Sequence, residues 1–320
     1  QQAWQDLADD EITDESQVNL KACVERALEL GINHVETARG YGSSERQLGR
    51  ILPQLPREDI IVQTKVPPAD SKTAFLETFE TSMDRLQLER VDLLAFHGVN
   101  NDDVLDRVVS GGNLEAAREL QAQGRVGFVG FSSHAGYPTL LKAIETDEFD
   151  YMNLHWFYVD QRNTPALEAA ARRDMGTLII SPNDKGGKLY DPPEKLTRLC
   201  QPYTPMAFNA LFCLARADVH TLSIGVAAPE QFDALVKVLP DVPRAADAIA
   251  PVCERLAAEM ERQLGRDWLD HWQTGLPTVL PGDVYPYHVL RLDNLYRAFD
   301  MLAYGKMRYN LLGSGGHWFP

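Results

Sequence analysis

Four side chains able to move a proton follow the ends of three consecutive short strands predicted from the sequence. A carboxylate ends the first strand, a tyrosine follows it in the next loop, and a lysine and a histidine end the next two strands. They are Glu36, Tyr41, Lys65 and His97, at or just after the ends of strands expected at residues 34–37, 60–64 and 91–96. In a barrel of parallel strands the carboxyl ends all lie at one face, so the four side chains can share one pocket.

Together these groups could deliver a proton to a carbonyl oxygen. A tyrosine, with a reference pKa of about 10, is a poor acid at neutral pH unless a cation stabilises its phenolate. Lys65 could supply that cation, Glu36 could orient Lys65, and His97 could hydrogen-bond the substrate oxygen. A hydride must reach the carbonyl carbon at the same time, which requires a nicotinamide cofactor. Each residue alone has an ordinary structural explanation, but their joint placement predicts an enzyme that reduces an aldehyde or ketone, with Tyr41 as proton donor.

Up to residue 240, short apolar strands alternate with amphipathic helices, which is typical of parallel strands covered by helices on both sides of the sheet. Seven strands are expected, at residues 34–37, 60–64, 91–96, 126–131, 151–154, 177–180 and 220–224. The helices are expected at residues 17–30, 45–52, 73–86, 114–123, 137–145, 165–173 and 229–239. This order predicts an α/β fold of the (β/α)8 or TIM-barrel class.

The first strand of such a barrel is not evident. Residues 1–16 are too polar to supply it, and a barrel without it would have two unpaired edges. Either residues precede Gln1 in the native protein or the barrel closes irregularly, and the unpaired edges favour the first of these. A seven-stranded, doubly wound open sheet is the alternative, which is disfavoured because no matching GxGxxG turn follows a strand.

After residue 240 the pattern changes to a small helical C-terminal extension. We predict two domains, a barrel at residues 1–240 and the extension at residues 241–320, with helices at 245–264 and 289–304. Ten aromatic residues lie in this extension, and side chains of that kind contribute most when buried. We therefore expect it to pack against the barrel or another subunit, with residues 313–320 as an exposed or docking terminus.

The composition narrows the classes of partner. A net charge of -15 argues against binding to nucleic acid and to anionic membranes, which both need clustered Lys and Arg. The four cysteines lie far apart, without the spacing of metal ligands, and are interpreted as reduced thiols. The sequence has no apolar run of membrane-spanning length, and its first residues do not resemble a signal peptide. We expect a cytoplasmic protein without a metal site that acts on a small molecule; its oligomeric state is left open.

One segment resembles a known family. Residues 31–49, GINHVETARGYGSSERQLG, resemble the signature of the aldo-keto reductases around their catalytic carboxylate and tyrosine. Lys65 and His97 fall where the lysine and histidine of that family lie. The resemblance covers roughly residues 17–240. It implies a (β/α)8 barrel, carbonyl reduction and NADPH or NADH as cofactor.

The resemblance also implies where the cofactor binds. The segment 127–133, GFVGFSS, is similar to the one that holds the nicotinamide amide, and Asn153 matches the next amide contact. The implied cofactor-binding residues are Ser132, Ser133, Asn153, Ser181, Gly225 and Gln231.

Several positions differ from the family pattern. Glu36 replaces an aspartate, and Ile180 replaces the tyrosine that stacks on the nicotinamide ring. Gly225 and Gln231 replace the Lys and Arg that commonly grip the 2′-phosphate of NADPH. NADPH is favoured by the resemblance, but without those cations we expect its advantage over NADH to be small.

The C-terminal extension carries a second resemblance. Residues 290–296 and 304–310 are similar to the tail of a bacterial subgroup of these reductases that has a cysteine-rich, ferredoxin-like Fe–S region. Residues 254–320 contain no cysteine. Because thiolates are the ligands of such clusters, we expect no Fe–S cluster.

Two other functions compete with the reductase. The first is a cofactor-binding regulatory or scaffold protein with the reductase fold and little turnover, which Glu36, Ile180 and the weakened phosphate loop favour. The second is a phosphate-binding barrel isomerase, since this fold hosts many chemistries. The isomerase would bind no dinucleotide.

Overall fold

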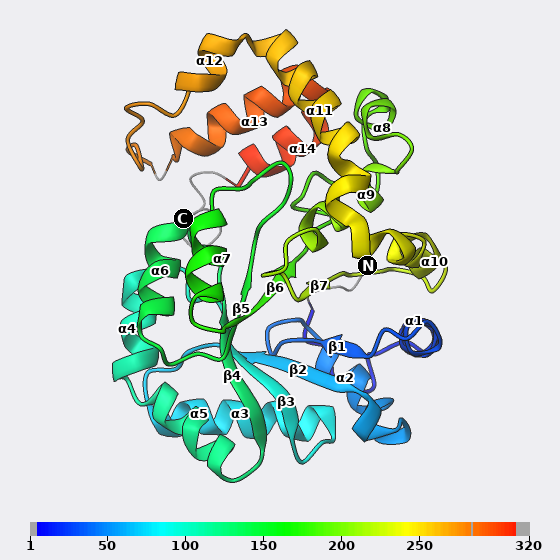
Figure 1. Ribbon diagram of the computed structural model, residues 1–320. Coiled ribbons are helices and arrows are strands. Elements are labelled where there is room, and N and C mark those ends of the chain that lie inside the picture. The colour runs from blue at the N-terminus through cyan, green and yellow to red at the C-terminus, as the bar shows by residue number, and fades with distance from the viewer. Residues whose placement is uncertain (1–4, 283, 312–320) are drawn as a thin grey trace.

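The computed structural model describes residues 5–282 and 284–311. Within them, seven parallel strands form one sheet in which each strand pairs with the next along the chain. The strands are β1 His34–Glu36, β2 Ile61–Val66, β3 Val91–Phe96, β4 Val126–Ser132, β5 Tyr151–Leu154, β6 Gly176–Ile180 and β7 Thr221–Ser223. The sheet curls into a nearly closed barrel surrounded by helices (Figure 1), which confirms the predicted fold class.

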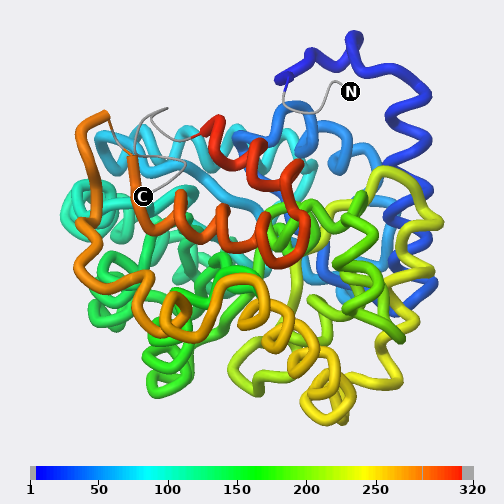
Figure 2. The backbone as a smooth tube through the Cα atoms, turned by 90° about the horizontal axis from the view of Figure 1, so that it is seen from above, coloured from blue at the N-terminus to red at the C-terminus, as the bar shows by residue number. Residues whose placement is uncertain are grey.

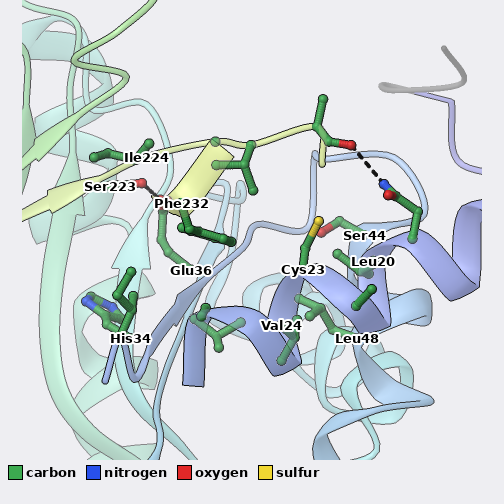
Figure 3. A pocket seen from close by; sticks show the side chains of 18 of the residues that line it. Leu20, Cys23, Val24, His34, Glu36, Ser44, Leu48, Ser223, Ile224 and Phe232 are labelled. Atoms are coloured by element: carbon green, nitrogen blue, oxygen red, sulfur yellow. Dashed lines mark hydrogen bonds between the residues drawn. The ribbon is translucent and has the colours of Figure 1, made fainter. Parts of the chain in front are cut away.

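The two ends of the sheet are β1 and β7. In the described sheet each of these strands has only one hydrogen-bonded neighbour, so the barrel has a seam between them. A cavity of about 1410 Å³ lies beside this seam, lined by β1, β7 and the flanking helices α1 (Asp14–Glu29) and α10 (Gln231–Val236) (Figure 3). One side-chain hydrogen bond crosses the seam, from the Ser223 hydroxyl to the Glu36 carboxylate.

Helices with one apolar face cover the outside of the sheet. In α3 the buried residues Phe75, Phe79, Met83 and Leu86 recur every three or four positions, so one stripe of the helix meets the strands. The helices up to the seventh strand are α1, α2 Ser44–Gly49, α3 Lys72–Leu86, α4 Asp102–Ser110, α5 Asn113–Ala122, α6 Tyr137–Glu145, α7 Thr164–Ala171, α8 Glu194–Cys200 and α9 Pro205–Leu214.

Three of these helices, α4, α8 and α9, were not predicted from the sequence. The expected helix 229–239 is also shorter, since α10 covers only Gln231–Val236 and a 3-10 helix follows at Leu239–Arg244. Pro240 and Pro243 lie in that second segment and lack the amide hydrogen that an α-helix requires.

The C-terminal extension contains α11 Ala245–Leu264, α12 Arg266–His271, α13 Pro286–Phe299 and α14 Leu302–Tyr309. The single helix expected at 289–304 is wrong, because the chain turns between α13 and α14. Asp300 caps α13 in a left-handed conformation with φ 60°, which aspartate tolerates better than most residues. The short α12 was not predicted either.

The extension shares its core with the barrel helices. Apolar residues of α11, α13 and α14 form one buried cluster with residues of α8 and α9. Figures 1 and 2 show the extension lying across one end of the barrel. Of its predicted buried aromatic residues, Phe299 and Tyr304 are buried, whereas Tyr296 and Tyr309 are exposed. The expected terminus at 313–320 lies outside the described residues.

Over the described ranges, no helix is long and apolar enough to cross a membrane. The four cysteines form no disulfide, and three of them are buried. No group of His, Cys, Asp and Glu side chains that could hold a metal ion occurs in this part of the chain.

A substitution at Gly49 tests the close contact between α2 and α3. A Cβ atom at Gly49 would lie 2.0 Å from the Arg85 carbonyl oxygen, so Gly49→Ala must push the helices apart. We expect it to lower the free energy of unfolding by about 1–3 kcal/mol in urea titrations. Gly305→Ala in α14 is the control, since a Cβ there meets nothing closer than 3.9 Å and should stabilise the helix by roughly 0.5–1 kcal/mol. Equal effects of both changes would contradict the close packing.

Candidate active site

Lys65 is the centre of the site. It lies near the end of β2, and its side chain is fully buried. The ammonium group contacts the Glu36 carboxylate, and it donates hydrogen bonds to the Thr37 carbonyl at 3.1 Å and to the Tyr41 hydroxyl at 3.3 Å. An acceptor is therefore available for each of its three hydrogens, as a buried cation requires.

The backbone between β1 and β2 explains this convergence. The Thr37 amide donates to the Gln63 carbonyl and the Arg39 amide donates to the Lys65 carbonyl, both at 2.9 Å, so the pairing continues beyond β1. The Tyr41 amide then closes a turn onto the Ala38 carbonyl at 3.0 Å. This turn brings the tyrosine side chain back over the end of β2.

The environment changes the acidity of both partners. Burial raises the pKa of Tyr41 and lowers that of Lys65 to about 7. The Glu36 carboxylate acts in the opposite direction on Lys65, because it stabilises the charged amine. The amine also lies 4.6 Å from the centre of the Tyr41 ring. A positive charge here would stabilise the phenolate left when Tyr41 gives up its proton.

His97 lies on the other side of Tyr41. Its ring meets the Tyr41 ring edge-on, with the centroids 5.5 Å apart. Burial and the charges of Lys65 and Lys185 lower the pKa of His97 to about 4. The imidazole is therefore neutral at pH 7, and a neutral imidazole still carries one N–H donor. The structure thus brings all four predicted catalytic residues to one end of the barrel.

Glu45 is a supporting residue that the sequence reasoning missed. Its carboxylate is fully buried and accepts a hydrogen bond from the Thr64 hydroxyl at 2.6 Å. Arg39 lies 3.9 Å from the same carboxylate. Burial raises the pKa of Glu45. Glu45 follows the loop that carries Tyr41, and Thr64 precedes Lys65, so this bond ties the two segments together.

Ser132, Ser133 and Asn153 lie at the ends of β4 and β5. Ser132 pairs with Asn153 across the sheet, and its hydroxyl accepts from the Gly98 amide at 3.1 Å. Ser133 is already fully engaged, since its hydroxyl donates to the Val99 carbonyl and accepts from an amide two residues on. Among the described residues, the fully buried Asn153 amide nitrogen has no hydrogen-bond partner. A carboxamide oxygen would satisfy it.

The remaining predicted cofactor residues lie nearer the seam. Ser181 follows β6 in a left-handed conformation, with φ 53°, and its amide donates to the Ser223 carbonyl at 3.2 Å. Gly225 is exposed, and its carbonyl accepts from Tyr190 at 2.6 Å. The Gln231 side chain accepts from the Ala227 amide at 2.7 Å. The Gln231 side chain therefore stabilises the loop between Ala227 and Gln231.

Comparison with known proteins shows which family the chain resembles. A family model described as the Aldo/keto reductase family matches residues 3–139. This part of the chain is therefore similar to the aldo-keto reductase family. A solved aldo-keto reductase of Bacillus halodurans, AKR11C1 in its holo form, superposes on this chain with a TM-score of 0.66 at 22% identity, covering 75% of this chain and 87% of that one. At that identity the likeness establishes the fold.

Curated relatives match shorter stretches of this chain. L-galactose dehydrogenase of Arabidopsis thaliana is 35% identical over 120 residues, which are 35% of this chain and 37% of that protein. The uncharacterized oxidoreductase YqkF of Bacillus subtilis is 32% identical over 177 residues, 51% of this chain and 55% of that protein. The matched regions thus span from about a third to just over half of these relatives.

The neutral state of His97 can be measured directly. We expect its imidazole, assigned by comparison with His97→Gln, to titrate near pH 4 in NMR spectra, so it stays neutral from pH 5 to 8. In Lys65→Met the midpoint should rise, because one of the charges that disfavour imidazolium is gone. A midpoint near 6.5, the ordinary value for histidine, would contradict the described environment.

Proposed function

We propose that this protein reduces an aldehyde or ketone to an alcohol, with Tyr41 as the proton donor. The observation that carries the proposal is the contact of one buried amine, Lys65, with both the Tyr41 hydroxyl and the Glu36 carboxylate. A buried ion pair of this kind adds little to stability compared with apolar residues of similar size. Its position beside a tyrosine hydroxyl fits a role in proton transfer.

Each residue has a distinct role in the proposed reaction. The carbonyl oxygen would lie between the Tyr41 hydroxyl and the His97 imidazole, where two neutral donors stabilise the negative charge that develops on it. Tyr41 gives its proton to that oxygen. Lys65 then stabilises the phenolate, and Glu36 keeps the lysine charged and oriented.

The nicotinamide cofactor, NADPH or NADH, would supply the hydride to the carbonyl carbon. The buried Asn153 amide, which has no partner in the described part of the chain, and the Ser132 hydroxyl fit the carboxamide of such a cofactor. Ser133 would instead hold the loop after β4. Ile180, Gly225 and Gln231 would contact the cofactor without a stacking ring or a cation.

Removing the Tyr41 hydroxyl tests the proton donor. In Tyr41→Phe we expect reduction of a reactive aldehyde such as 4-nitrobenzaldehyde to fall by about a hundredfold or more. Cofactor affinity, read from quenching of tryptophan fluorescence, should survive because the ring remains. Unchanged turnover would overturn the assignment. A wild-type protein that binds the cofactor but reduces no aldehyde would instead favour a regulatory or scaffold role.

The loop after β7 predicts weak discrimination between the two cofactors. No Lys or Arg occurs between Gly225 and Gln231, and Arg26 of α1 is paired with Asp233 of α10. We therefore expect dissociation constants of similar size for NADPH and NADH in fluorescence titrations. Gln231→Arg should strengthen NADPH binding selectively, because it adds a charge-assisted partner for the 2′-phosphate. A large NADPH preference in the unaltered protein would show that another cation binds that phosphate.

A further inference from the structure

A second group of polar side chains lies at the ends of the next three strands. His134, His155 and Lys185 follow β4, β5 and β6. The Lys185 amine lies 3.3 Å from Nδ1 of His134 and 3.1 Å from Nε2 of His155, and the two imidazole rings are 4.6 Å apart. We call these three residues the Lys185 cluster.

The C-terminal extension covers the Lys185 cluster and adds cations to it. Tyr304 of α14 donates to the Lys185 carbonyl at 2.5 Å. Arg308, one turn further along α14, contributes a charge that lowers the pKa of Lys185 and of His134. Arg162, in the loop after β5, contacts His288 of α13 at 2.7 Å. The extension and the barrel therefore build this cationic region jointly.

Two carboxylates of the described residues lie near the Lys185 cluster, and neither is in contact with the Lys185 amine. Asp160 lies near Arg162 and Arg291, at 3.8 and 3.6 Å, and Asp184 is exposed. Within the described chain no carboxylate comes within 4.0 Å of the Lys185 amine. Burial and the Arg308 charge lower the pKa of that amine to about 7, although the Asp184 charge acts in the opposite direction. Gathering cations in partly buried surroundings is unfavourable, and in a chain of net charge -15 it indicates a site for an anion.

The Lys185 amine differs from the Lys65 amine in the number of hydrogen-bond acceptors around it. An ammonium group has three hydrogens, and two of those on Lys185 point at imidazole nitrogens. In the described residues no acceptor is recorded for the third. Lys185 is half-buried rather than enclosed, so an external ligand can supply the missing acceptor.

The Lys185 cluster adjoins the proposed active site. His134 directly follows Ser133, and His155 lies two residues after Asn153. The Lys185 charge lowers the pKa of His97, and the His97 charge lowers that of His134. An anion on Lys185 would therefore lie on the His97 side of the site, after β4 to β6, whereas the loop from Gly225 to Gln231 follows β7.

We propose that the Lys185 cluster binds a carboxylate group of the carbonyl substrate, so that this enzyme prefers negatively charged aldehydes or ketones. The inference rests on the proposed carbonyl reduction for its kinetic test but not for its binding test. The carboxylate accepts the third hydrogen of the Lys185 ammonium, for which the described residues offer no acceptor. The extension then determines specificity, because it holds Lys185 through Tyr304.

The kinetic test compares two aldehydes of nearly the same shape. 4-Carboxybenzaldehyde carries a charge where 4-nitrobenzaldehyde carries a neutral group. The ratio of kcat/KM for the charged aldehyde to kcat/KM for the neutral one therefore measures the effect of the charge, and it is compared between wild type and variant. We expect Lys185→Met to lower this ratio by about tenfold or more, the loss of one charge-assisted hydrogen bond. Lys306→Met, which removes an exposed cation from α14, should leave the ratio unchanged. An unchanged ratio in Lys185→Met would overturn the proposal.

A binding test separates this inference from the proposed function. Calorimetry with the wild-type protein should show binding of benzoate and much weaker binding of benzamide, whether or not any aldehyde is reduced. Benzoate binding should disappear in Lys185→Met and persist in Lys306→Met. Equal affinity for benzoate and benzamide would overturn the carboxylate site. A loss of NADPH affinity in Lys185→Met, with benzoate binding intact, would assign the cluster to cofactor binding and would also overturn the proposal.

Folding of the variants is checked by thermal unfolding. Because Lys185 has no carboxylate partner in the described chain, Lys185→Met should be at least as stable as the wild type. If this variant does not fold, the same measurements are made with Lys185→Gln. Its amide keeps a hydrogen-bond donor for the imidazoles but removes the charge.

Discussion

A buried ammonium group constrains the whole end of the barrel. Lys65 has no contact with water, so a charge on it depends on the groups that β1 and its loop provide. Removing one partner from such a pair typically costs about 3–5 kcal/mol, because the other charge is then left uncompensated. The turn at Tyr41, the continued pairing beyond β1 and the Glu45–Thr64 bond all serve to keep those partners in place.

The charges of the molecule are unevenly distributed. The chain is strongly acidic overall, yet Lys65, Lys185 and several arginines gather at one end of the barrel. Burial makes neutral donors of His97 and Tyr41 at pH 7, so the carbonyl would meet hydrogen-bond donors rather than permanent charges. The extension belongs to the same arrangement, since α13 and α14 contact loops that follow β5 and β6.

The strand ends were predictable because the apolar runs stop there, and the proposed site lies at those ends. Glu36, Tyr41, Lys65 and His97 were selected in this way as candidates, and all seven predicted strands are present within two residues at each end. The break after Phe299 was missed because apolar periodicity continues across it, and only the left-handed Asp300 ends the helix. Glu45 and the Lys185 cluster were missed since their partners are distant in sequence, so no local pattern connects them.

The seam between β1 and β7 gives Glu36 two tasks. One carboxylate oxygen contacts Lys65, and the other accepts from Ser223 on the opposite edge. A substitution at Glu36 therefore disturbs the lysine and the joint between the first and last strands at once. Ser223→Ala separates these effects, since it breaks the joint and leaves the ion pair. In this protein, the acid that contacts the buried lysine also helps to join the two edges of the barrel.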